Sequence, residues 1–175
     1  MAIVSRIDLT NISSEVRDVI EGHKAKGYRI TNMKETLLHS VTSFQSLEDG
    51  VYNLQEELEK YLDKRTVVIF GYAISSNDDC IICSNYFKKI LIDNGIDYNT
   101  FEFSDDELLL IQFAKEFVES KAHVSDGVLD KLGKRFDEKQ LVEITSFAAL
   151  LVANNYFNNA LRVELDDYLL EYQDK

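Results

Sequence analysis

The chain has 175 residues with no proline and no tryptophan, and its 19 basic and 31 acidic residues give a formal net charge of −12. At a usual frequency of about 5%, roughly nine prolines would be expected, so their absence excludes cis-proline switches and proline-rich linkers. The negative charge repels phosphate backbones and anionic lipid heads, so we expect no nucleic-acid partner and no membrane partner.

The N-terminal third is predicted to be helical. Residues 14–26 form a short helix that ends at Gly27. Asn32, followed three residues later by Glu35, is typical of a capping box and predicts the start of a second helix. Apolar residues then recur at helical spacing well beyond it, with a predicted break near residues 49–50.

Residues 66–74 (TVVIFGYAI) form the one segment with an ambiguous pattern. Their β-branched and aromatic side chains would suit a buried strand. No neighbouring segment offers a partner strand, however, and an isolated strand would leave its backbone groups unpaired. We therefore predict a buried helix.

The rest of the chain also has helical signals. The capping residues at 76–79 predict a helix start there, and this helix ends at residues 93–95. The later helices are predicted at residues 105–120, at 125–133, from 137 onward and at 161–172. No linker or repeat divides the chain, so we predict a single all-α domain of about eight helices over residues 1–175.

Two cysteines, Cys80 and Cys83, form a CxxC pair at a predicted helix start. In a reducing cytosol such a pair is more typical of redox or metal chemistry than of a structural disulfide. The helix dipole favours a thiolate there, and the three-residue spacing places both sulfurs on one face. Asp78 and Asp79 oppose this effect, because their negative charge stabilises a neutral thiol.

Several alternatives exist for the CxxC pair. A thioredoxin-like site is disfavoured because its helix should follow a strand. Structural zinc needs about four ligands, and the three histidines, His23, His39 and His123, are scattered, with His23 predicted on a solvated surface. The remaining alternative is that both cysteines are small buried residues without chemistry. We expect no metal and no cofactor.

The CxxC helix, the continuation FKKIL into Gly95, and the helical segments at 105–118, 141–159 (ending YFNN) and 161–167 together form a pattern. This pattern resembles the carboxymuconolactone decarboxylase and alkylhydroperoxidase D-like superfamily over about residues 37–169. The resemblance implies an all-α fold that assembles into trimers or hexamers. It also implies a peroxidase in which Cys83 attacks the peroxide and Cys80 resolves the intermediate.

Two residues of the family's proton relay are missing. The family places a histidine four residues after the second cysteine, where this chain has Phe87. It places a glutamate about a dozen residues before the first cysteine, near Val67 or Val68 here. Because a general base contributes roughly 100- to 10,000-fold, the resemblance implies slow chemistry.

The sequence thus predicts a cytoplasmic, homo-oligomeric thiol peroxidase or disulfide reductase, with antioxidant activity through Cys83 and Cys80 and a thiol protein as its possible reductant. The alternative is a non-enzymatic or redox-sensing oligomer of the same fold with an inert CxxC pair. Rapid alkylation of both thiols in the native protein would favour chemistry. Labelling only after denaturation would favour the inert alternative.

Overall fold

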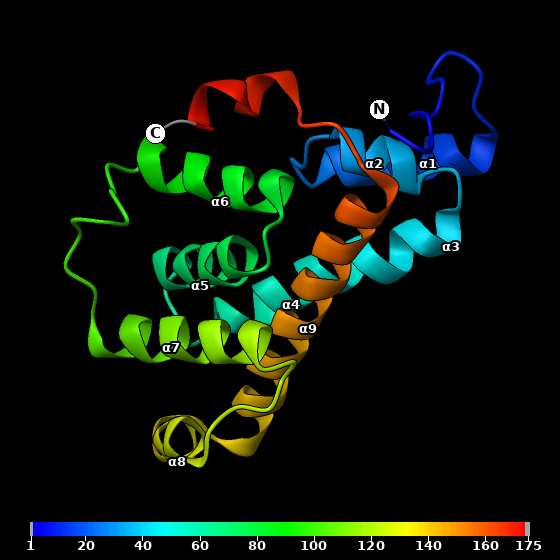
Figure 1. The fold of residues 1–175 in the computed structure, drawn as a ribbon. Helices are drawn as coiled ribbons and strands as arrows, with labels where there is room; N and C mark the ends of the chain where they lie inside the picture. The colour runs from blue at the N-terminus through cyan, green and yellow to red at the C-terminus, as the bar shows by residue number, and fades with distance from the viewer. Residues whose placement is uncertain (1, 174–175) are drawn as a thin grey trace.

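The computed structural model describes residues 2–173, and over that range the chain forms helices and no strands (Figure 1). The all-α prediction is confirmed, with nine α-helices in the described range where about eight were predicted. The predicted domain limits, residues 1 and 175, lie outside it. The helices are α1 (Ser14–Ala25), α2 (Asn32–Leu37), α3 (Val41–Phe44), α4 (Gly50–Leu58), α5 (Lys64–Asn77), α6 (Ile81–Asp93), α7 (Asp105–Glu119), α8 (Asp126–Arg135) and α9 (Glu138–Leu161).

The ambiguous segment at 66–74 lies in α5, as predicted, and α5 packs between α6 and α7 (Figure 1). Its side chains are buried along most of the helix. Phe70 packs against Phe113 of α7 and Phe147 of α9, with ring centroids 6.0 and 5.9 Å apart. This burial outweighs the modest helix propensity of β-branched residues.

The N-terminal helices are divided differently from the prediction. The chain breaks at residues 38–40, and α3 then continues through a π-helical turn (Gln45–Asp49) into α4. Gly50 is inside this helical run rather than at a break, since its φ is −62°. A Cβ atom at Gly50 would lie 2.9 Å from Leu150 of α9, so glycine allows α4 and α9 to approach closely. Such π-turns are frequent at functional sites.

Several predicted helix ends are shifted. The capping run at 76–79 instead ends α5, and the next helix begins at Ile81 with Cys80 as its N-cap. Gly133 lies inside α8 rather than at its end. The stretch 161–172 is not one helix, because α9 ends at Leu161 and only Asp167–Tyr172 forms a 3₁₀-helix, which covers α6.

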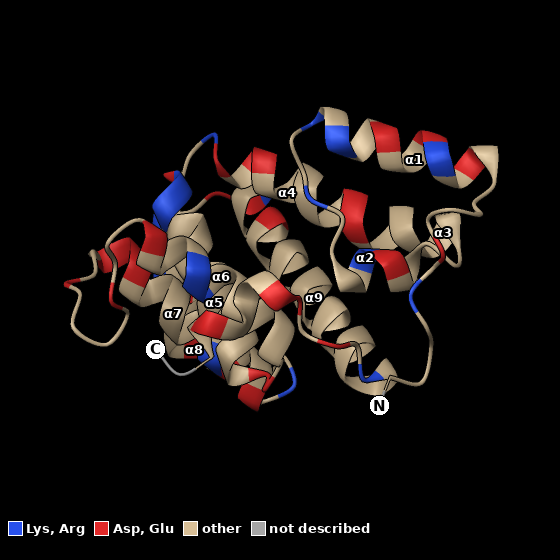
Figure 2. Cartoon of the chain, turned by 90° about the horizontal axis from the view of Figure 1, so that it is seen from above, with Lys and Arg blue, Asp and Glu red and all other residues tan. Residues whose placement is uncertain are grey.

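Two apolar clusters make up the interior. The larger cluster contains residues from each of the helices α4 through α9, and the smaller contains residues from α1, α2 and α3. Figure 2 shows Lys and Arg spread singly over the elements in that view, without a continuous basic face. Within residues 2–173, no helix combines the length and apolar character that crossing a membrane requires.

Candidate active site

The first turn of α6 brings the two cysteines together. Cys80 is the N-cap and is buried, whereas Cys83, one turn along, is half-buried and lines a cavity. Both are free thiols in this structure. The polar group that joins them is the amide of Asn158 from α9, whose Nδ2 lies 3.3 Å from Cys83 Sγ and 3.8 Å from Cys80 Sγ. A donor at this distance stabilises negative charge on sulfur.

The two thiols have opposite pKa shifts. Hydrogen bonds from the Cys83 thiol, from the Cys83 and Ile82 backbone N–H groups and from Asn158 lower the pKa of Cys80 to about 7, against the effect of burial. The pKa of Cys83 is raised, because its thiol proton is held by Cys80 and because burial and the nearby negative charge of Glu48 disfavour a second thiolate. These opposite directions favour Cys80 over Cys83 as the thiol that loses its proton first.

The neighbouring aspartates, Asp78 and Asp79, lie in the turn between α5 and α6. The Asp78 carboxylate is held by Asn155, whose Nδ2 donates to it at 3.0 Å, and Asp79 has a left-handed backbone with a φ of 49°. This turn places Cys80 at the N-cap of α6, next to the first backbone N–H groups of the helix. The largest influence that lowers the pKa of Cys80 is the hydrogen bond from its partner thiol, Cys83.

A thiol titration checks this assignment. In the reduced protein, we expect one thiolate to form with a midpoint near pH 7, since the lowered pKa of Cys80 keeps the thiolate above that pH and restores the thiol below it. The ultraviolet absorbance of the thiolate measures the transition. Cys80→Ser should remove it. Absence of any thiolate signal until well above pH 8 in the wild type would contradict the assignment.

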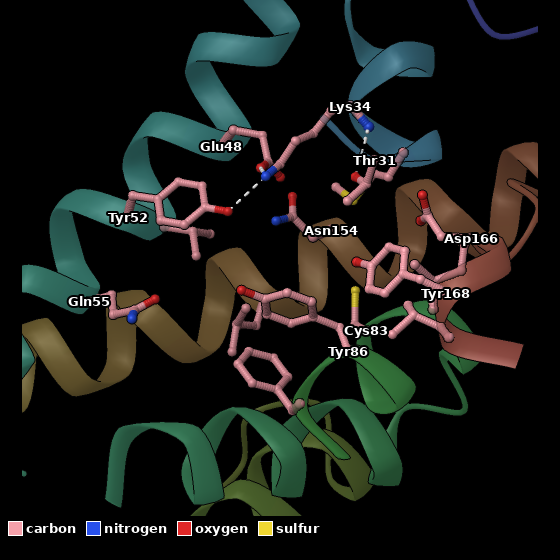
Figure 3. A pocket seen from close by; sticks show the side chains of 16 residues that line it. Thr31, Lys34, Glu48, Tyr52, Gln55, Cys83, Tyr86, Asn154, Asp166 and Tyr168 are labelled. Atoms are coloured by element: carbon pink, nitrogen blue, oxygen red, sulfur yellow. Dashed lines mark hydrogen bonds and ion pairs between the residues drawn. The ribbon is translucent and has the colours of Figure 1, made fainter. Parts of the chain in front are cut away.

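A narrow cavity of about 80 Å³ opens beside Cys83 (Figure 3). It lies where the two apolar clusters meet, so its walls come from both halves of the chain. The apolar side chains that line it are Met33, Val51, Ile82, Phe87, Leu151 and Leu169, and the tyrosines are Tyr52, Tyr86 and Tyr168. The polar side chains are Thr31, Lys34, Glu48, Gln55, Asn154 and Asp166. The cavity is thus an apolar space with a few polar groups at its wall.

A buried ion pair faces this cavity. Lys34 of α2 and Glu48 of the π-turn are each 5% exposed, and Lys34 Nζ lies 3.4 Å from Glu48 Oε2. The same ammonium donates to the Tyr52 hydroxyl at 2.7 Å and to the Arg29 carbonyl at 3.0 Å. Burial lowers the pKa of Lys34 and raises that of Glu48. Charged side chains at this depth are rare unless they are paired.

These polar residues were missed in the sequence, although a signal was present. Glu48 lies four residues after Phe44 and three before Val51, both of which are buried, so it occupies an apolar stripe at helical spacing. Asn154 and Asn158 lie one turn apart in the C-terminal part of the long helix α9, and asparagine is a weak helix former. Polar residues at such positions indicate a requirement other than helix formation.

The positions of the missing relay are apolar here. Phe87 is buried and packs on Gly71 of α5, where an added Cβ would lie 2.5 Å from the Phe87 ring. Val67 and Val68 are buried in the core. His23 corrects a prediction, because it is buried against the Tyr52 ring rather than solvated, and burial lowers its pKa to about 4. Among residues 2–173, no three potential metal ligands are grouped.

No protein-family profile matches the sequence, and no curated protein matches it. Solved structures do match in shape. A variant of the debrominase Bmp8 in complex with 2,3,4-tribromopyrrole has a TM-score of 0.78 at 18% identity, over 99% of this chain and 97% of that chain. A peroxidase-related protein from Silicibacter sp. TM1040 has a TM-score of 0.78 at 14% identity, over 99% and 95%.

A third similar structure carries the name of the fold. It is the alkylhydroperoxidase AhpD core of an uncharacterized peroxidase-related protein from Ralstonia eutropha JMP134, with a TM-score of 0.71 at 15% identity, over 99% of this chain and 97% of that chain. All nine α-helices of the described range fall within that likeness. The chain therefore has the AhpD-like all-helical fold over nearly its whole length.

Proposed function

We propose that the protein is a dithiol peroxidase that reduces a small organic hydroperoxide through Cys83 and Cys80. The observation that carries the proposal is the placement of the pair: Cys83 borders the cavity, while Cys80 lies behind it at the N-terminus of α6. A nucleophile at the cavity wall with a second thiol in reach is the arrangement that a two-step thiol reduction needs.

In this proposal, Cys80 acts first as the base. Its thiolate takes the proton of the Cys83 thiol, and the Cys83 sulfur attacks the terminal oxygen of the hydroperoxide. The O–O bond breaks, an S–O bond forms, and the products are a Cys83 sulfenic acid and an alkoxide that takes up a proton. Cys80 then attacks the Cys83 sulfur, releasing water and leaving a disulfide. An external dithiol restores the thiols, so the peroxide is reduced and the dithiol is oxidised.

The size of the cavity favours a small oxidant. About 80 Å³ corresponds to on the order of six water-sized groups, which suits a short alkyl hydroperoxide such as tert-butyl hydroperoxide. Two of the similar structures are described as peroxidase-related. The complex of the Bmp8 variant with 2,3,4-tribromopyrrole makes a brominated ring a second substrate to assay. In an assay with the brominated ring, bromide release is measured in place of peroxide consumption.

Cysteine variants test the proposal. With dithiothreitol as reductant, Cys83→Ser should abolish consumption of tert-butyl hydroperoxide, because the attacking sulfur is gone. In the absence of dithiothreitol, Cys80→Ser keeps the attacking sulfur but lacks both the base and the resolving thiol, so it should consume at most one equivalent of peroxide, more slowly than the wild type, and form no intramolecular disulfide. Peroxide loss is followed by a colorimetric assay. Wild-type turnover that survives Cys83→Ser would contradict the proposal, and a wild type without turnover would favour the non-enzymatic alternative.

A further inference from the structure

The chain lacks the histidine and glutamate of the family relay, but the alkoxide formed at Cys83 still needs a proton. A proton donor for it should border the same cavity, be shielded from water and be connected to a second acidic group. Three tyrosines border the cavity, Tyr52, Tyr86 and Tyr168. Within residues 2–173, Tyr52 is the one of these three whose hydroxyl accepts a hydrogen bond from an ammonium group.

The contacts of Lys34 determine what Tyr52 can donate. Lys34 Nζ donates to the Tyr52 hydroxyl at 2.7 Å, so that oxygen is the acceptor in this bond and keeps its own proton for another partner. A hydroxyl that accepts from an ammonium group is polarised and becomes a stronger donor. Glu48 lies on the far side of the ammonium, at 3.4 Å, and holds the positive charge in this buried position.

The positions of these side chains in the cavity are compatible with proton donation by the Tyr52 hydroxyl. In Figure 3, the Tyr52 hydroxyl and the Cys83 sulfur both point into the cavity, from α4 and α6, with the Asn154 side chain between them and Lys34 above. Tyr52 is fixed by its stacked partner Tyr28, with ring centroids 3.8 Å apart. This stacking holds the Tyr52 ring, and with it the hydroxyl, in a fixed place at the cavity wall.

We propose that Tyr52 is a catalytic residue that donates its hydroxyl proton to the leaving alkoxide oxygen, with Lys34 and Glu48 as the residues that position and resupply that proton. This inference rests on the peroxidase activity proposed above. The step balances: the alkoxide takes the Tyr52 proton, Tyr52 takes one from the Lys34 ammonium, and the resulting amine regains a proton from water. The lowered pKa of Lys34 makes this transfer easier, and the raised pKa of Tyr52 keeps the hydroxyl protonated before the reaction.

The test compares two oxidants that differ in their leaving group. Tert-butyl hydroperoxide leaves as a strongly basic alkoxide that needs a proton, whereas peracetic acid leaves as acetate, which needs none. In single-turnover reactions of the reduced protein, Tyr52→Phe should slow the reaction with tert-butyl hydroperoxide by about 100-fold. It should leave the reaction with peracetic acid nearly unchanged. Sulfenic acid formation is followed by stopped flow and mass spectrometry.

Two matched controls use the same change in the same cavity. Tyr86→Phe and Tyr168→Phe remove hydroxyls without a lysine partner, and neither should show the dependence on the leaving group. A general disturbance of the cavity would slow both oxidants alike, and that result, or equal rates for Tyr52→Phe and wild type, would overturn the role of Tyr52 while leaving the peroxidase proposal intact. A wild type that reacts with tert-butyl hydroperoxide no faster than glutathione does would overturn both the role of Tyr52 and the peroxidase proposal.

Thermal melts show whether each variant is folded. If Tyr52→Phe is not folded, Lys34→Arg tests the same relay. A guanidinium gives up its proton far less readily than an ammonium, so that variant should also lose rate selectively with tert-butyl hydroperoxide.

Discussion

Replacing Lys34 with alanine is expected to lower the free energy of unfolding by about 3–5 kcal/mol, because removing one partner of a buried ion pair leaves the other charge uncompensated. Glu48 is 5% exposed and would lose its cation, and the Tyr52 hydroxyl and the Arg29 carbonyl would each lose a donor. Chemical denaturation of the reduced wild type and variant at neutral pH measures the difference.

The pH dependence of this penalty has a defined sign. Burial raises the pKa of Glu48 above its ordinary value of 4.5, and loss of Lys34 raises it further. A carboxyl group whose pKa is higher in the folded than in the unfolded state binds its proton more tightly in the folded state. The free energy of unfolding therefore falls as the pH rises from the unfolded-state pKa through the folded-state pKa. The cost of Lys34→Ala should therefore shrink as the pH falls from neutral into the acidic range.

A double variant separates charge from packing. Lys34→Met with Glu48→Leu removes both charges and keeps apolar volume, so it should recover most of the stability lost in Lys34→Ala. Arg65→Ala is a useful comparison, because the buried Glu107 would keep its hydrogen bonds from the Ser104 backbone N–H at 2.7 Å and from the Thr66 hydroxyl at 3.4 Å after the loss of Arg65. If Lys34→Ala cost no more than Arg65→Ala, the inner ion pair would not contribute as described.

The helices themselves follow from local chemistry. Ser104 with Glu107 and Asp137 with Gln140 form the two capping boxes that begin α7 and α9, and both pairs are legible in the sequence. The buried helix at 66–74 follows from the lack of a partner strand. The π-turn at Gln45–Asp49 could not be predicted, because no local sequence motif distinguishes it from the α-helical turns on either side. Helix ends shifted where polar residues ended a helix rather than starting one.

The candidate site divides in the same way. The CxxC pair is a local motif, so its presence at a helix start was predictable, and so was the loss of the histidine at Phe87. The ion pair of Lys34 and Glu48 joins two elements through a turn of irregular geometry, and sequence spacing does not determine that contact. Asn158 approaches the thiols only because α9 crosses α6.

The central claim is that Cys83 and Cys80 act together as a reducing pair at the cavity. The second large effect that we expect is therefore that peroxide removes the thiols of Cys80 and Cys83 together and completely. Fully reduced protein treated with one equivalent of tert-butyl hydroperoxide should lose both thiols and yield one intramolecular disulfide. The sulfenic acid on Cys83 should be captured by Cys80 on the same turn of α6 faster than it is oxidised further.

Thiol counting combined with intact-protein mass spectrometry is the measurement that tests this claim most directly. The account predicts that both thiols disappear together, that the protein loses the mass of two hydrogens, and that peptide mapping finds Cys80 joined to Cys83. Retention of both thiols after the peroxide is added, or accumulation of a sulfinic acid on Cys83 while Cys80 stays free, would contradict it.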